Sequence, residues 1–256
     1  MRVVKVLLVL LLATATSAQA LPIVQHQGDT NPASEGWTLY NPSYGSVLAG
    51  TETTSSGAWD YWQISHPSTA IPPNFYRYGL SSTDLEGDWY FSAWVRVVDS
   101  RGHQYFSSHI PMGDLLIRDD YSTWGLMLGN DIVGIMNSAV VFSRSHQMDT
   151  RDDYHHYELF FHQNNPGYAD DTVTYKIDGT TVFSDVTRAE VQNISSYSGS
   201  LRGVLIGSGS SGAYTVINYS DLELDASVPV PEPSTLGLFF SGLLFLVLST
   251  RKRIIR

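Results

Sequence analysis

Three pairs of adjacent aspartates are the residues in this sequence best suited to bind a metal ion. They are Asp119-Asp120, Asp152-Asp153 and Asp170-Asp171, and each pair lies in a segment expected to form a loop. Calcium takes six to eight oxygen ligands, and loop carboxylates and carbonyls often supply them. The spacing matches no EF-hand, so ordinary polar loops are the alternative. Calcium is the only cofactor that the sequence predicts, and these six aspartates are its candidate ligands.

A second group of residues has the chemistry to bind a sugar. Tyr90, Trp94 and Arg96 alternate along a predicted strand at residues 89–98 and therefore share one face of it. Aromatic rings offer an apolar face with a polar edge, and a guanidinium adds planar hydrogen-bond donors. We predict a carbohydrate-binding surface from these three residues. The alternative is that they pack between the sheets or under a loop.

Two further patterns suggest known kinds of binding site, but their structural context argues against both. Residues 207–212 read Gly-Ser-Gly-Ser-Ser-Gly, as in a dinucleotide-binding loop, but a strand-like segment follows them instead of a helix. We interpret this segment as a hairpin loop. His156 and His162 would share a strand face at a separation of about 20 Å, which is too far to chelate one ion. We therefore predict neither a nucleotide site nor a transition-metal site.

The elements that must position these residues are β-strands. Between residues 21 and 226, short apolar runs are broken by turn-forming residues, and none has a long helical period. Residues 155–162 and 172–177 alternate in the same way as 89–98, and Asp178-Gly179 predicts a two-residue hairpin turn. Other predicted strands are 37–40, 59–64, 115–118, 125–128, 131–142, 181–183, and a last pair at 204–206 and 214–217 that ends in 221–224.

About twelve to fourteen strands in about 200 residues are typical of two packed antiparallel sheets. The sequence has no internal repeat and no sign of a second domain, so we predict that residues 21–226 form one all-β sandwich of jelly-roll type.

The order of these strands resembles the concanavalin A-like lectin/glucanase superfamily, in its laminin-G-like branch. The residues that carry the resemblance are 156–160, 173–179, 204–207 and 219–222. Glucanases of the superfamily can carry three acids on one strand, and Glu223-Leu224-Asp225 begins such a pattern. The third acid is missing, and the segment continues into a proline-rich stretch. We therefore predict no catalytic residue and no enzyme activity.

The start of the chain has the three parts of a secretory signal peptide. Arg2 and Lys5 provide positive charge, residues 6–13 are apolar, and Ala18-Gln19-Ala20 has the small residues of a cleavage site. We predict that residues 1–20 are a signal peptide with Ala18 and Ala20 at the cleavage site.

The end of the chain is also tripartite. Residues 227–234 form a proline-rich linker with Pro231-Glu232-Pro233, residues 235–250 carry no charge, and residues 251–256 are basic. As a helix, 235–250 would be about 24 Å long, and flanking arginines could extend its reach in a bilayer. We predict a transmembrane helix there, with the basic end in the cytoplasm and the sandwich outside.

This tail resembles a PEP-CTERM sorting signal. The resemblance implies recognition, and cleavage near Pro231, Glu232 and Pro233, by an integral membrane exosortase. It also implies a Gram-negative producer of extracellular polysaccharide. A plain C-terminal anchor is the alternative.

The charge of the middle of the chain limits its partners. Residues 21–226 contain nine basic and 24 acidic residues, and Lys176 is their only lysine. This net charge of −15 repels nucleic acid and anionic lipid, which need cationic partners. Neutral sugars, divalent cations and basic partners remain.

Three functions are consistent with these observations. The first is a cell-surface or extracellular-matrix protein, exported and sorted by exosortase, whose lectin-like domain binds polysaccharide or another partner. The second is a structural envelope domain without a small ligand, and the third is a polysaccharide hydrolase. We prefer the first. The second predicts a convex polar exterior, and the third predicts two buried carboxylates facing one cleft.

Overall fold

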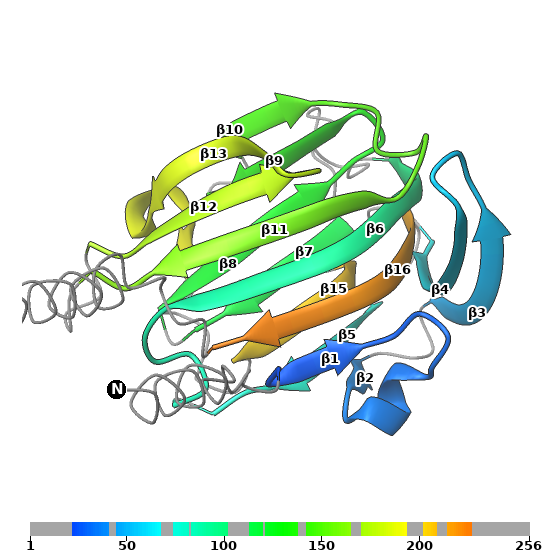
Figure 1. Ribbon diagram of the computed structural model, residues 1–256, viewed down its shortest axis with the longest axis horizontal. Coiled ribbons are helices and arrows are strands. Elements are labelled where there is room, and N and C mark those ends of the chain that lie inside the picture. Colours follow the sequence, from blue (N-terminus) through cyan, green and yellow to red (C-terminus); the bar gives the residue numbers. More distant parts are fainter. Residues whose placement is uncertain are drawn as a thin grey trace, which may run out of the picture.

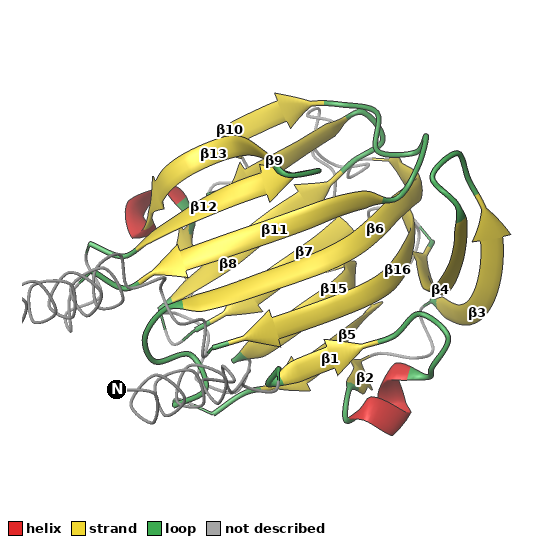
Figure 2. Ribbon diagram, viewed as in Figure 1, coloured by secondary structure: helices red, strands yellow, loops and turns green. Residues whose placement is uncertain are grey.

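The computed structural model describes residues 22–40, 45–67, 74–81, 83–101, 113–119, 121–137, 142–164, 170–193, 202–208 and 214–226. They form two antiparallel sheets that pack face to face, as Figure 1 and Figure 2 show. The predicted all-β, two-sheet sandwich is confirmed.

Several predicted segments lie outside these residues. They are the signal peptide at 1–20 with Ala18 and Ala20, Asp120, the linker at 227–234 with Pro231, Glu232 and Pro233, the helix at 235–250, and the basic end at 251–256. In the part of the chain that the structure describes, no helix is long and apolar enough to cross a membrane.

The first sheet faces the viewer in Figure 1. Its strands lie in the order β13 (Thr180–Thr187), β12 (Thr172–Ile177), β11 (His155–His162), β6 (Trp89–Arg101), β16 (Tyr214–Asp225), β4 (Ala58–His66) and β3 (Ser46–Thr53), and β1 (Val24–His26) also pairs with β16.

The second sheet lies behind the first. Its order is β10 (Phe142–Gln147), β9 (Ile132–Met136), β8 (Ser122–Leu128), β7 (Gly113–Arg118), β15 (Gly203–Ser208), β5 (Asn74–Gly79) and β2 (Thr38–Tyr40), and β14 (Gln192–Asn193) pairs with β8. Two short 3₁₀ helices, η1 (Pro32–Glu35) and η3 (Arg188–Glu190), complete the described elements.

Two sequence predictions about strand pairing are wrong. Residues 204–206 and 214–217 do not form a last pair, because β15 belongs to the second sheet and β16 to the first. The glycine-rich segment between them therefore connects two sheets and is not a hairpin loop. The range 131–142, predicted as one strand, contains β9 and the first residue of β10, which are two separate strands that pair with each other. In contrast, Asp178 and Gly179 turn as predicted, with φ of 51° and 74° between β12 and β13.

The core lies between the sheets and explains the alternation seen in the sequence. On β6, Trp89, Phe91 and Val95 are buried, whereas Tyr90, Trp94 and Arg96 on the opposite face are partly exposed. The same holds on β11, where Tyr157, Leu159 and Phe161 point inward. Because the pleat sends alternate side chains to opposite faces, the outer face of the first sheet is free to hold a site.

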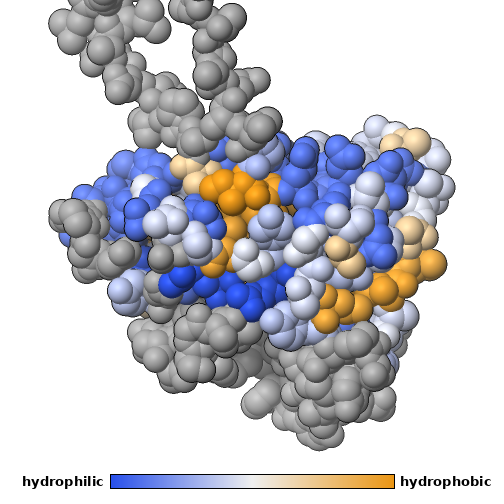
Figure 3. Space-filling model, turned by 90° about the horizontal axis from the view of Figure 1, so that it is seen from below, coloured by the Kyte–Doolittle hydropathy of each residue, from blue (hydrophilic) through white to orange (hydrophobic). Residues whose placement is uncertain are grey.

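Large hydrophobic side chains are rarely exposed among the described residues. The exposed ones are Leu48 on β3, Val98 on β6 and Tyr121 before β8, with exposed fractions of 57%, 39% and 45%. Figure 3 views the molecule from below Figure 1 and shows hydrophobic residues gathered in limited patches between hydrophilic ones. Leu48 is on the edge strand β3, opposite Gln63 of β4, and Val98 is near the end of the central strand β6.

Candidate functional site

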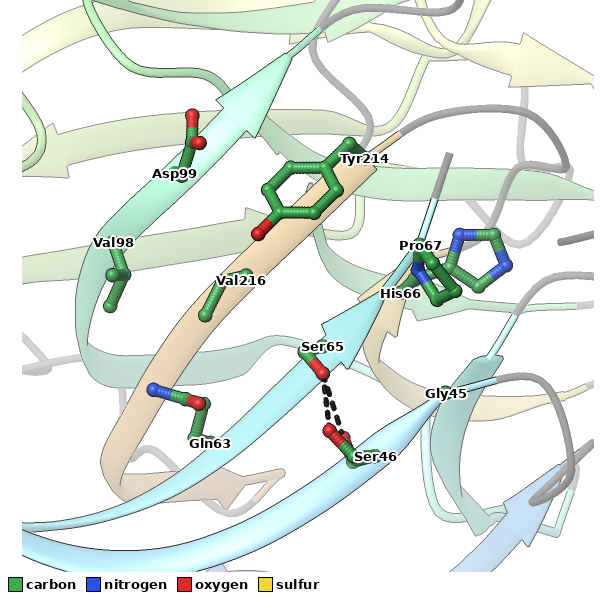
Figure 4. A pocket seen from close by; sticks show the side chains of 10 residues that line it. All are labelled: Gly45, Ser46, Gln63, Ser65, His66, Pro67, Val98, Asp99, Tyr214 and Val216. Carbon is green, nitrogen blue, oxygen red and sulfur yellow. Dashed lines mark hydrogen bonds between the residues drawn. The ribbon is translucent and has the colours of Figure 1, made fainter. Parts of the chain in front are cut away.

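A groove of about 950 Å³ lies on the outer face of the first sheet, over the ends of β3, β4, β6 and β16. Figure 4 shows its side chains: the Tyr214 ring, Val98 and Val216 come from β16 and β6, and polar side chains come from β3 and β4. The described lining residues are Gly45, Ser46, Gln63, Ser65, His66, Pro67, Val98, Asp99, Tyr214 and Val216. An aromatic ring, two valines and several polar groups in one groove provide both stacking and hydrogen bonding.

The register of the sheet explains how distant residues meet here. Val216 of β16 is opposite Ser65 of β4, which is opposite Ser46 of β3, and the Ser46 and Ser65 hydroxyl oxygens are 2.6 Å apart. One step along the strands, Asn218 is opposite both Arg96 and Gln63. The groove is therefore built from side chains in adjacent rows across the sheet, with Tyr214 in the row beyond Val216.

A chain of hydrogen bonds runs from the groove toward the middle of the sheet. Gln63 Nε2 donates to Asn218 Oδ1 at 2.9 Å, and Asn218 Nδ2 donates to Glu52 Oε1 at 2.8 Å. Tyr154 Oη donates to the same Glu52 oxygen at 2.7 Å, and Arg96 Nη1 binds Glu52 Oε2 at 2.5 Å. The Asn218 side chain is buried, and its hydrogen bonds to Gln63 and Glu52 hold its amide in place from both ends. We call Gln63, Asn218 and Glu52 the relay.

An aromatic cluster of Trp59, Trp94, Tyr154 and His156 lies beside the relay. Trp94 stacks on His156 with ring centroids 4.6 Å apart, and Trp59 approaches Trp94 at 4.9 Å and Tyr154 at 4.7 Å. Two aromatic neighbours therefore pack against the Trp94 ring. The contacts between the rings stabilise the cluster, and they reduce the ring area left for a ligand.

The turn between β3 and β4 is fixed to this cluster by Asp153. Its carboxylate accepts hydrogen bonds from the backbone N–H of Ser56 at 2.9 Å and from the hydroxyls of Thr54, Ser55 and Ser56. Desolvation acts to raise the pKa of Asp153, but these hydrogen bonds outweigh it and hold the pKa well below its usual range. Asp153 thus fixes the turn of the β3–β4 hairpin to the segment that precedes β11.

The three predicted carbohydrate-binding residues lie together on the outer face, as the alternation requires, and each has partners inside the protein. Arg96 binds Glu52 and donates to the Arg151 carbonyl at 2.8 Å. Tyr90 Oη donates to Glu158 at 3.0 Å, and burial is the main cause that raises the pKa of Tyr90 to about 12. Trp94 belongs to the aromatic cluster. None of the three is among the described residues that line the groove.

Arg188 joins two of the predicted calcium ligands. Asp119 and Asp171 bind its guanidinium at 3.0 and 2.9 Å, and Asp171 is fully buried. Asp119 also accepts hydrogen bonds from the backbone N–H groups of Tyr121 and Ser122, so its oxygens already have donors.

The remaining described aspartates lie apart from this pair. Asp152 is 3.0 Å from His155 Nε2, Asp153 holds the β3–β4 turn, and Asp170 is exposed. Within the described ranges, no group of three or more His, Asp or Glu side chains is placed to hold a metal ion. Calcium binding stays a prediction of the sequence.

The acids of the incomplete three-acid pattern, Glu223 and Asp225, lie near the end of β16, opposite Ser92 and Tyr90 of β6. They are away from the groove, where Asp99 is the only carboxylate among the described lining residues.

Sequence reasoning missed the groove because its residues come from four strands. One signal was present. Val98 continues the outward face of Tyr90, Trp94 and Arg96 on β6, and an apolar residue there departs from the polar pattern of an exposed face.

One comparison with known proteins concerns the tail alone. Residues 229–253 match the family model described as the PEP-CTERM protein-sorting motif. These residues are a PEP-CTERM sorting motif. The prediction that the tail is a PEP-CTERM sorting signal is confirmed, and the motif implies exosortase-dependent export to the cell surface or beyond. No curated protein matches the chain.

Several solved structures resemble the sandwich. Alginate lyase Aly36B is 15% identical with a TM-score of 0.48, covering 80% of this chain and 97% of the lyase. An endo-beta-1,4-glucuronan lyase from the fungus Trichoderma reesei is 11% identical at a TM-score of 0.48, covering 81% and 96%. The binding domain of Paraclostridial Mosquitocidal Protein 1 is 11% identical at 0.46, covering 78% of this chain but only 47% of that domain. At these values the likenesses assign neither a family nor an activity, and the concanavalin A-like relationship stays a prediction.

Proposed function

We propose that this exported protein binds polysaccharide outside the cell, in the groove on the outer face of the first sheet. The observation that carries the proposal is the groove itself, which combines the Tyr214 ring and exposed Val98 with the fixed amide of Gln63. Sugar rings have apolar faces and hydroxyl edges, and such a mixed lining suits both. The sorting motif is consistent with this role, because it implies export.

We propose binding and not hydrolysis. A retaining hydrolase needs two carboxylates about 5–5.5 Å apart, and an inverting one needs them about 6.5–9.5 Å apart. The described lining of the groove contributes one carboxylate, Asp99, which also accepts a hydrogen bond from Asn130 at 3.1 Å. We also propose that the sandwich is a lectin-like domain related to the concanavalin A-like superfamily, and that residues 235–250 anchor the chain in the membrane.

A structural envelope domain is the second candidate. The aromatic cluster and the relay favour it, because Trp94, Arg96 and Glu52 are all engaged inside the protein. Such contacts stiffen a sheet without any ligand.

The test is binding of the purified full-length chain to the producer's own extracellular polysaccharide, first with calcium and then with chelator. We expect saturable binding that Tyr214→Ala weakens at least tenfold. Loss of binding in chelator would support the predicted calcium, with Asp152, Asp153 and Asp170 as the first residues to replace. No binding in either condition, with the protein folded, would leave the structural candidate.

A further inference from the structure

We propose that the groove selects uncharged glycans and rejects those with carboxylates, because the relay turns the carbonyl oxygen of Gln63 toward the ligand. This inference rests on the proposed function and names the ligand class of the same site. It also identifies Gln63 as the residue that determines this specificity.

The direction of the relay follows from chemistry. Glu52, paired with Arg96, is a carboxylate and can only accept hydrogen bonds. Asn218 must therefore point its NH₂ group to Glu52, 2.8 Å away, and its oxygen to Gln63. Gln63 must then use its own NH₂ group toward Asn218, 2.9 Å away. This orientation leaves the carbonyl oxygen of Gln63, an acceptor, and the second N–H of its amide for the groove.

The other polar groups of the groove add acceptors. Asp99 contributes a carboxylate. The Ser46 and Ser65 hydroxyls bond to one another at 2.6 Å, which uses one of their two protons and leaves lone pairs. Hydroxyl groups of a neutral sugar can donate to each of these acceptors. A uronate carboxylate has no proton to donate to these acceptors, and the negative charge of Asp99 would repel it.

The positions of the basic residues support the same conclusion. None of the nine basic residues of the domain is in the groove's described lining: Arg77, Arg96, Arg101, Arg118, Arg144, Arg151, Lys176, Arg188 and Arg202. Arg96 lies opposite Asn218, and Glu52 binds its guanidinium. Arg101 lies opposite Tyr214 in the β6–β16 register, two residues after Asp99. No lysine or arginine occurs in the gaps between the described segments of 22–226.

The experiment varies one functional group on one polymer. The producer's extracellular polysaccharide is used as isolated, after chemical reduction of its carboxylates to alcohols, and after oxidation of its primary hydroxyls to carboxylates. Binding of the full-length chain is measured for each form at low and at high salt. We expect the reduced form to bind at least as tightly as the isolated form. The oxidised form should bind at least tenfold more weakly, and salt should narrow that difference by screening repulsion.

The outcomes separate the two claims. Tighter binding of the oxidised form, or loss of binding on reduction, would overturn the selectivity and leave glycan binding intact. No binding of any form would overturn the proposed function, and the selectivity with it.

A substitution at Gln63 tests the residue that the relay orients. In Gln63→Lys the ammonium can still donate to Asn218, but the acceptor in the groove is replaced by a positive charge. We expect this variant to shift its preference toward the oxidised polymer by at least tenfold relative to wild type. Thr174→Lys is the matched control, because it adds the same charge to the outer face on β12, away from the groove. An equal shift in both variants would show that net charge, and not Gln63, sets the preference.

Discussion

The aromatic cluster and the groove lie on the same outer face but differ in what their side chains do. In the cluster, Trp94 packs against two rings, and Arg96 binds Glu52. In the groove, Tyr214 and Val98 line an open hollow of about 950 Å³, and Val98 keeps 39% of its surface exposed. The side chains of the cluster hold one another in place, and the groove is where we propose that a ligand binds. Residue type alone does not separate the two, since both contain aromatic and polar side chains.

The largest expected effect is on stability, at the cluster. Trp94→Ala removes the ring contacts with Trp59 and His156 and should lower the free energy of unfolding by about 3 kcal/mol. For a domain of this size we expect a decrease in Tm of roughly 6–12 °C. Thermal unfolding measures it, with Trp94→Phe as the milder control. Polysaccharide binding by the folded variant should stay near that of wild type. A large loss of binding with little loss of stability would move the binding site to the cluster.

The opposite profile is expected at the groove. Tyr214→Ala removes a partly exposed ring at the end of β16 and should weaken polysaccharide binding at least tenfold. The free energy of unfolding should change by less than about 1 kcal/mol, because the ring is not part of the core. Titration with polysaccharide and chemical unfolding measure the two quantities on one preparation. Tyr214→Phe keeps the ring and should retain most of the affinity.

A pH-dependent effect is expected where the loop before β11 meets the β12–β13 turn. His155 Nδ1 is 2.8 Å from Asp178, and Nε2 is 3.0 Å from both Asp152 and the Asp149 carbonyl. Because carboxylates and carbonyls only accept, both ring nitrogens must carry protons. Burial acts to lower the pKa of His155, but the hydrogen bonds with Asp178 and Asp152 outweigh it and raise the pKa above 6.5.

A raised pKa means that the folded state holds this proton more tightly than the unfolded state. The stabilisation is therefore fully present below about pH 6.5 and is lost as the pH rises through the folded-state pKa. We expect His155→Gln to remove that step from a plot of the free energy of unfolding against pH. Identical plots for wild type and variant would contradict the role of His155.

The smallest effect is expected at an exposed ion pair in the same loop. Arg151 and Asp149 are both about half exposed, with their charged atoms 3.3 Å apart. Exposed pairs contribute little to stability, so Arg151→Ala should leave the midpoint of thermal unfolding almost unchanged. Its backbone carbonyl, which accepts from Arg96, is unaffected by the substitution. A clear decrease in that midpoint would show that the loop depends on side-chain charge.

Much of the fold could be predicted from the sequence because alternation is local. The outward set of Tyr90, Trp94 and Arg96 and the turn at Asp178-Gly179 each depend on a few neighbouring residues. Strand pairing is not local. Nothing in residues 204–217 indicates that β15 and β16 enter different sheets, since each pairs with strands more than 80 residues earlier, such as β7 and β6.

The candidate site could be predicted only in part, for the same reason. The sequence predicted which residues of β6 share its outer face, but not which of them have partners inside the protein. The contact between Arg96 and Glu52 joins positions 44 residues apart, and Asn218 binds Glu52 across 166 residues. The Asp119 and Asp171 side chains were grouped with loop ligands for calcium, and their shared partner Arg188 is far from Asp119 in sequence.

Polysaccharide binding by the groove is tested most directly by titrating the wild-type chain, Tyr214→Ala and Trp94→Phe with the producer's extracellular polysaccharide under one set of conditions. The groove predicts saturable binding by wild type and by Trp94→Phe, and at least tenfold weaker binding by folded Tyr214→Ala. Equal binding by wild type and Tyr214→Ala would contradict a site in the groove, and no binding by folded wild type would contradict a glycan-binding function.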